Sequence, residues 1–489
     1  MLDLLKPPAM LAVLAAALVV GAVLVARQIS RRLNWDPAGP IALIAAAPLL
    51  PHVAVIASLS FDDLLPLVGL GMLAWRLPVP RLSGDPLMRG LLVAVVVAIG
   101  ARVASALANG GGLEGTILML GQAIARPVVL LGMVAYVAVT RPMERRQRLT
   151  MIAIASIGTF EAVFGLIAFV VPLPWDLGLQ AARPMTSAYG VCRGLVNGTL
   201  GLSANHLGAV FVLALPLTVA LAVRGPGWAR WGWLLAASAQ AAALALTFTR
   251  SSILIAGVLA VTLLIFQRRV VLMAAAMAVT TTLLLVVSLS AGCAVSSSSG
   301  GPVGGFVGLA GGRITDGNDR LALWYAAAHI MVDHPLFGVG LDQMAVILKE
   351  DPARYRPTPF GPAGNSAHNT ILLAGAETGI VGALAILAIN VGLALLALRC
   401  VWRGWRRRDV LPAAAGLVIG GYLVQGMFNN LFSIPGTSSI LALLVGAFAV
   451  SQVVSGEAKG GSSPPTGDEQ PSPYTRPAVD TNDMAGAGG

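Results

Sequence analysis

Residues 369–398 read NTILLAGAETGIVGALAILAINVGLALLAL, with a single ionisable side chain, Glu377. The hydrocarbon core of a bilayer is about 30 Å thick, so a spanning helix needs roughly 20 apolar residues. The stretch exceeds that length, and its apolar residues are continuous rather than alternating, which favours a helix over a barrel strand. It therefore predicts a transmembrane helix.

Comparable apolar runs recur along the chain. Hydrophobic residues make up 56% of the sequence and the mean hydropathy is +0.81, which excludes a soluble globular protein. The fold class we expect is all-α: a polytopic integral membrane protein with about 12–13 transmembrane helices. The predicted spans are 8–26, 38–59, 61–75, 87–108, 113–140, 149–171, 204–223, 231–248, 251–266, 270–290, 369–398, 410–428 and 437–454.

The net charge of +10 has a distribution typical of a membrane protein rather than of a nucleic-acid-binding one. Basic residues collect in the short connections 27–35, 76–89, 141–148, 224–230, 267–269 and 399–409. These alternate with connections of little charge, so the positive-inside rule assigns them to the cytoplasm. Residues 172–203, the junction at 249–250 and the long segment 291–368 then face outward, and strict alternation also puts the N-terminus outside.

The chain divides into three parts by composition. Residues 1–171 are N-terminal transmembrane helices, and residues 172–454 form a second membrane region that includes the large outer loop 291–368 with short helices. Residues 455–489 are rich in Gly, Ser, Pro and acidic side chains, which predicts a disordered cytoplasmic tail. Cys192 and Cys293 share the predicted outer side, where they are either a disulfide or two unrelated thiols.

His368 is the sharpest candidate for chemistry. It precedes Asn369 and a new apolar run at the predicted outer surface. Imidazole accepts a proton near neutral pH, as a general base must, although a polar residue at this place also suits a helix N-cap. Glu377 lies nine positions further along and half a turn out of phase, so we expect a structural role for it, such as pairing with an arginine of another helix.

Three arginines are candidates for binding an anion. Arg250 lies between two apolar runs, and a guanidinium suits bidentate phosphate binding, although snorkelling at a helix end is equally consistent. Arg193 lies in a glycine-rich outer loop, where an ordinary solvated arginine is the alternative. Arg320 begins a helix predicted to run to Asp333 and to end at His334-Pro335, an element that also suits the membrane surface.

Two further ionisable residues, Arg126 and Glu161, fall near the middle of their spans. Burying such a group in a membrane costs free energy, so each is expected to have a partner. They predict either a structural ion pair or a path for protons or substrate.

In order along the chain stand Arg193, Ala204-Asn205-His206, Thr247-Phe248-Thr249-Arg250-Ser251, Arg320-Leu-Ala-Leu-Trp324, His334-Pro335-Leu336-Phe337-Gly338-Val339-Gly340, His368-Asn369 and Ala376-Glu377-Thr378-Gly379. Over residues 185–450 this set resembles the O-antigen ligase family, which includes O-antigen and exopolysaccharide polymerases. The resemblance implies an inverting, metal-independent glycosyltransferase of the bacterial inner membrane, without a cofactor and with its active site facing the periplasm.

The resemblance also implies the partners and the roles of residues. The donor would be a glycan linked to undecaprenyl diphosphate, and the acceptor a glycan or the lipid A-core; the other partner is the lipid bilayer, and no nucleic acid is expected. His368 would deprotonate the acceptor, Arg250, Arg193 and Arg320 would bind the diphosphate, and Asn369 and Glu377 would support the site.

Two other functions remain open from the sequence. A polymerase would use the same donor with a second lipid-linked glycan as acceptor. A transporter or flippase of lipid-linked glycans is favoured by the many spans and by Arg126 and Glu161, but the polar residues gather at one face, and no repeated pair of broken helices is visible.

Overall fold

The structure is a computed structural model of the chain. It describes residues 41, 44–49, 54–56, 59–60, 66–69, 85–112, 115–116, 119–121, 143–170, 182–183, 195–196, 204–247, 249–268, 275, 277, 279–280, 282, 317–355, 366–433 and 435–449. The predicted span 8–26, most of 38–75, 113–140 and 270–290, and the tail 455–489 lie outside these residues.

Helices dominate the described residues. The order is η2 (Ala47–Leu49), β1 (Ala54–Ile56), β2 (Leu59–Ser60), α4 (Pro86–Asn109), α6 (Met143–Val170), β3 (Ala182–Arg183), β4 (Leu195–Val196), α7 (Ala204–Arg224), α8 (Gly227–Leu246), α9 (Arg250–Phe266), α12 (Gly317–Asp333), α13 (Met344–Glu350), α14 (Pro352–Tyr355), α15 (Thr370–Arg407), α16 (Val410–Gly426), η6 (Leu431–Ser433) and α17 (Pro435–Ala449). The strands form two short antiparallel pairs, β1–β2 and β3–β4. The all-α class is confirmed.

Four of the described helices are long and apolar enough to cross a membrane: α4, residues Gln147–Ile167 of α6, α7 and α15. Shorter apolar helices are α9, α16 and residues Gly436–Phe448 of α17. A polytopic helical membrane protein is therefore confirmed. The predicted span 231–248 is helical as α8, but α8 is not among these apolar helices.

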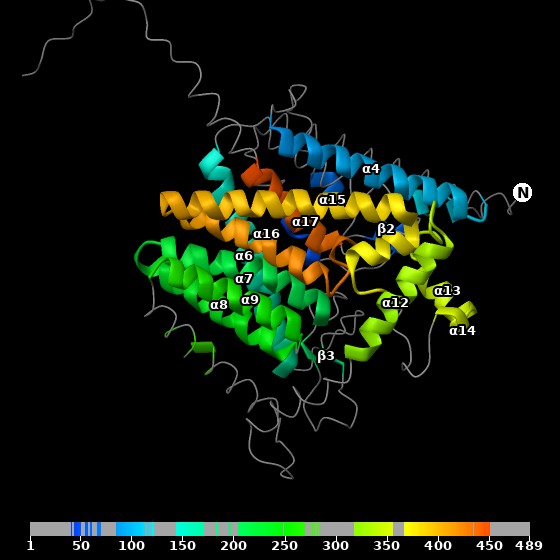
Figure 1. Cartoon of the computed structure of the whole chain (residues 1–489). Coiled ribbons are helices and arrows are strands. Elements are labelled where there is room, and N and C mark those ends of the chain that lie inside the picture. Colours follow the sequence, from blue (N-terminus) through cyan, green and yellow to red (C-terminus); the bar gives the residue numbers. More distant parts are fainter. Residues whose placement is uncertain are drawn as a thin grey trace, which may run out of the picture.

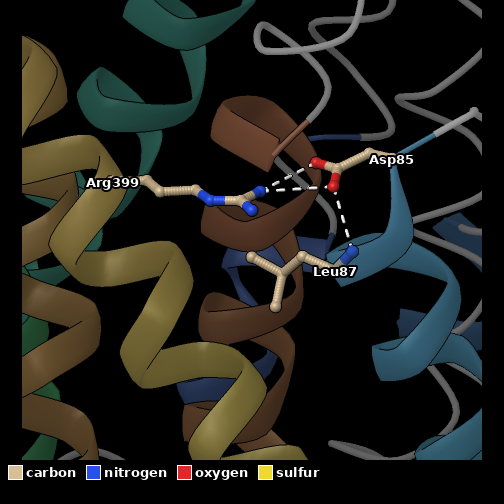
Figure 2. Close-up of polar contacts among 3 residues, drawn as sticks. All are labelled: Asp85, Leu87 and Arg399. Carbon is tan, nitrogen blue, oxygen red and sulfur yellow. Dashed lines mark hydrogen bonds and ion pairs between the residues drawn. The ribbon is translucent and has the colours of Figure 1, made fainter.

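The helices run side by side in a bundle, with α4, α15 and α16 together and α12 set obliquely beside one end of α15 (Figure 1). Helix α4 is antiparallel to α15. At one end Asp85 forms an ion pair with Arg399 at 3.0 Å and caps α4 by accepting from Leu87 N at 2.9 Å (Figure 2). At the other end Ser105 Oγ donates to the carbonyl of Glu377.

The bundle has a basic end, which is the end at which α15 terminates. Besides Arg399, it holds the Arg224–Asp409 ion pair at 3.0 Å and the contact between the rings of Phe266 and Trp405. Charged connections that are far apart in sequence are therefore gathered at one end, as the charge pattern predicted. We call the other end, where α15 begins, the site end.

Helix α7 forms the centre of the bundle, since nearly all of its residues are buried. It packs against α6, α8, α9 and α16. The fully buried Gln240 of α8 donates to Thr218 of α7 at 2.9 Å and to Thr159 of α6 at 3.0 Å. Polar side chains buried in a helical bundle are paired in this way because no water is there to solvate them.

Helix α15 differs from the predicted span in two respects. It continues to Arg407 instead of ending at 398, because helical hydrogen bonds persist past the point at which the side chains become basic. It is also interrupted at Gly379, whose φ of 75° and ψ of −172° are not helical. Gly375 packs closely against Met331 of α12, because a Cβ at this position would overlap the Met331 sulfur.

Several predicted pairings fall partly or wholly outside the described residues. Glu161 is fully buried in α6, but Arg126 is not described. Cys192 and Cys293 both lie outside the described residues. Cys400 is buried in α15.

Candidate active site

His368 lies at the site end, immediately before the N-cap of α15, and is partly buried. Its φ of 48° is in the left-handed region, which is uncommon for a residue other than glycine and costs about 1–2 kcal/mol. Burial lowers the pKa of His368, and the positive charge of Arg320 lowers it further. The imidazole is therefore neutral at neutral pH, which is the form that accepts a proton.

Asn369 fixes the backbone next to His368. Its Oδ1 accepts from the amides of Ile371 at 3.0 Å and Leu372 at 3.1 Å, so it caps α15. Its Nδ2 donates to the carbonyl of Met427, just past the end of α16, at 3.4 Å. The N-cap is thus Asn369 rather than His368, which leaves the imidazole of His368 available for another role.

Arg320 lies in the first turns of α12, and the packing of this helix on α15 fixes its place. The buried residues of α12 are Leu323, Ala326, Ala327 and Ile330, and they cluster with Leu373 and Ala376 of α15. Helix α12 ends at Asp333, as His334-Pro335 predicted. The two helices thereby bring Arg320 close enough to His368 to act on its pKa.

Arg250 begins α9, and its side chain is exposed. Among the described residues it has no ion-pair partner. Two residues further on, Ser252 is fully buried and accepts from Nε2 of Gln425 at 2.8 Å. Next to Gln425 in α16, the carbonyl of Gly426 accepts from Thr370 Oγ1 at 3.0 Å. This chain of contacts joins the start of α9 to the start of α15.

Arg250, Arg320 and His368 therefore all lie at the site end, opposite the basic end. The start of α7, with His206, is at the same end, because Gly208 packs against Thr249 and Ser252. Arg193 lies outside the described residues.

Glu377 bonds to the segment that follows α12. It is buried, and its Oε1 accepts from the backbone amide of Asp342 at 3.1 Å. The carboxylate thereby ties α15 to the turn that follows α12.

Two polar residues at this end could not be singled out from the sequence. Gln425 is fully buried and joins α16 to α9, and its only sequence signal is a polar residue within an apolar run. Ser105 of α4 bonds to α15, and nothing in its local sequence points there. No group of three or more His, Cys, Asp or Glu side chains that could hold a metal ion occurs in the described part of the chain.

Fold and site together define a polytopic helical membrane protein with a neutral histidine and arginines at one end of its bundle. Residues 233–387 match the family model described as O-antigen ligase. The matched stretch contains Arg250, Arg320, His368 and Glu377, and the match supports a membrane enzyme of the O-antigen ligase or polymerase type. No curated protein matches the chain.

Proposed function

We propose that the protein transfers a glycan from undecaprenyl diphosphate to an acceptor hydroxyl at the periplasmic face of the bacterial inner membrane. The observation that carries the proposal is His368, a histidine of lowered pKa beside Arg320, within the residues that match the O-antigen ligase family. A base of this kind is what the attack of a hydroxyl on a glycosyl carbon requires.

In the proposed reaction, His368 takes the proton of the acceptor hydroxyl. The acceptor oxygen then forms a bond to the anomeric carbon from the face opposite the diphosphate, while the bond from that carbon to the diphosphate oxygen breaks. The anomeric configuration is inverted, and undecaprenyl diphosphate leaves with the bonding electron pair. The proton remains on His368 until solvent removes it.

The arginines stabilise the leaving group in this proposal. Negative charge grows on the diphosphate in the transition state, and fixed guanidinium groups lower its energy. Arg250 suits this role because it is exposed at the site end and unpaired among the described residues. Arg320 and Arg193 would share the charge. The proposal assigns the basic end to the cytoplasm, by the positive-inside rule, and the site end to the periplasm.

The test uses the full chain, purified in lipid nanodiscs, with a glycan on undecaprenyl diphosphate and an acceptor containing lipid A-core. Formation of the joined product and release of undecaprenyl diphosphate are both measured. His368→Ala should abolish transfer while the protein accumulates in the membrane at its normal level. The matched control is His329→Ala, since His329 is exposed on α12 and its tilted ring contacts that of Tyr325. Wild-type transfer by the His368→Ala variant would refute the proposal.

The acceptor distinguishes ligase from polymerase. A ligase joins the glycan to lipid A-core, whereas a polymerase uses a second lipid-linked glycan and lengthens it in the absence of lipid A-core. Both activities use the same donor and the same base, so the two acceptors are offered separately and the products are compared by mass. Transport of the intact donor across sealed liposomes that contain the protein, without transfer to either acceptor, would assign the chain to the transporter class.

A further inference from the structure

The break in α15 at Gly379 leaves several backbone groups without their helical partners. In an uninterrupted helix the carbonyls of Ala376 and Glu377 would accept from the amides four residues later. Inside a bundle, such groups must find partners elsewhere, because each unpaired group costs several kcal/mol. The break is therefore tolerated only where a neighbouring segment supplies hydrogen bonds.

That segment is the turn 335–342, which follows α12. The amide of Val339 donates to the Ala376 carbonyl at 2.9 Å, and the amide of Gly340 donates to the Glu377 carbonyl at 3.2 Å. In return the amide of Ile380 donates to the Pro335 carbonyl at 2.8 Å. We call the turn 335–342 and residues 376–380 of α15 the junction.

Close packing at the junction leaves no room for side chains at two glycines. A Cβ on Gly338, whose φ is 63°, would overlap the backbone of Glu377. A Cβ on Gly379 would meet the carbonyl oxygens of Pro335 and Leu336. The turn and the broken helix are thus in direct backbone contact.

Helix α4 holds the junction from the other side. The fully buried Ser105 donates from Oγ to the Glu377 carbonyl at 2.6 Å. One turn later Asn109 donates from Nδ2 to the Gly338 carbonyl at 3.3 Å, and its Cβ packs against Gly340. Helix α4 lies outside the residues that match the O-antigen ligase family, so this contact joins the N-terminal helices to the family domain.

Both members of the candidate catalytic pair depend on the junction for their positions. The segment of α15 that begins just after His368 is only about two to three turns long before the break, too short to be a stable helix alone. Thr370 anchors its start to α16 by donating from Oγ1 to the Gly426 carbonyl at 3.0 Å, and the junction anchors its end. Helix α12, which carries Arg320, leads directly into the turn 335–342. A change at the junction therefore moves His368 and Arg320 relative to each other.

We propose that Ser105 and Asn109 of α4 are positioning residues for the reaction and act by holding the junction that sets the separation of Arg320 and His368. This inference rests on the proposed function. It assigns to α4 a role in the activity of residues 233–387, although α4 lies outside this family match.

The first test needs no activity. Hydrogen–deuterium exchange is measured in nanodiscs on peptides that cover the turn 335–342, for the wild type, Ser105→Ala and Asn109→Ala. Both variants should exchange faster in that turn, since its bonds to α15 lose their support. The matched control is Ser238→Ala: Ser238 is also buried, but its hydroxyl bonds within its own helix, to Leu234 O at 3.0 Å. Exchange at the wild-type rate in both α4 variants would overturn the inference.

The second test measures glycan transfer as a function of pH. Both variants should lower kcat by about 3- to 10-fold, the worth of one hydrogen bond, with a smaller change in KM. The acidic limb of the profile should also move to higher pH, because Arg320 is the charged group that acts on His368 among the described residues, and a looser junction weakens that action and admits water. A purely structural role would lower the amount of folded protein and leave this limb in place.

The outcomes separate the two proposals. If the wild type transfers a glycan, His368→Ala is inactive, and the α4 variants keep the wild-type kcat and pH profile, the positioning role is overturned and the proposed function stands. If the wild type transfers no glycan to any acceptor, the proposed function fails, while the exchange experiment still decides whether α4 holds the junction.

Discussion

Replacing Asn369 tests how far the cap of α15 determines the state of His368. In Asn369→Ala the amides of Ile371 and Leu372 lose their acceptor, and loss of such a cap costs about 0.5–2 kcal/mol. The bond from Nδ2 to Met427 O, at 3.4 Å, is long and adds little. Because each 1.4 kcal/mol is tenfold in rate, we expect kcat to fall by about 3- to 30-fold if the whole cost falls on the transition state.

Asn369→Asp separates the cap from the charge. A carboxylate oxygen caps a helix as well as an amide oxygen does, so the stability of the segment should be retained. The new negative charge lies next to His368, favours the imidazolium and raises the pKa of His368. The acidic limb of the pH–rate profile should therefore move to higher pH in Asn369→Asp, with a rate near the wild-type value on the alkaline side.

The assay combines initial rates of glycan transfer between pH 5 and 9 with hydrogen exchange over residues 370–378. Asn369→Ala should show faster exchange and a lower kcat, and Asn369→Asp should show neither at alkaline pH. Wild-type exchange together with a wild-type rate in Asn369→Ala would refute the reasoning that the cap holds the candidate base.

The other predictions concern charge. Arg320→Gln should raise the pKa of His368, because the positive charge that lowers it in the wild type is removed. The acidic limb of the rate profile should then move to higher pH. An unmoved limb would show that Arg320 does not act on the pKa of His368. Arg250→Ala should lower kcat by about 10²–10³-fold, and Arg250→Lys should restore little because lysine lacks the bidentate fork, as measured by initial rates at saturating donor. Arg399→Ala should change the stability by about 0–1 kcal/mol, because the ion pair is partly exposed, whereas Asp85→Ala should cost more, since Asp85 also caps α4; thermal unfolding in detergent at low and high salt compares them.

Apolar length alone located several helices well. The predicted span 87–108 is α4, Pro86–Asn109, and the predicted span 204–223 is α7, Ala204–Arg224. The hydrocarbon core sets how many apolar residues a span requires, so composition reports it directly. The length of the apolar run did not predict the end of α15. The helix continues into a basic segment that its composition had assigned to a connection.

Residue type and location were sufficient to nominate Arg250, Arg320 and His368 as site residues, since ionisable groups at the ends of apolar runs are few and stand out. Sequence alone did not predict the left-handed backbone of His368, the action of Arg320 on its pKa or the break at Gly379. Each of these depends on which helices pack together.

By itself the sequence determined that the chain crosses a membrane, which connections share an end, and where histidine and arginine side chains stand at the ends of apolar runs. Only the tertiary structure decided what holds those groups in place. Ser105 and Glu377 are 272 residues apart and meet through a hydroxyl and a backbone carbonyl. Every residue has a backbone carbonyl, so such a contact leaves no local pattern, and only the packing of α4 on α15 determines it.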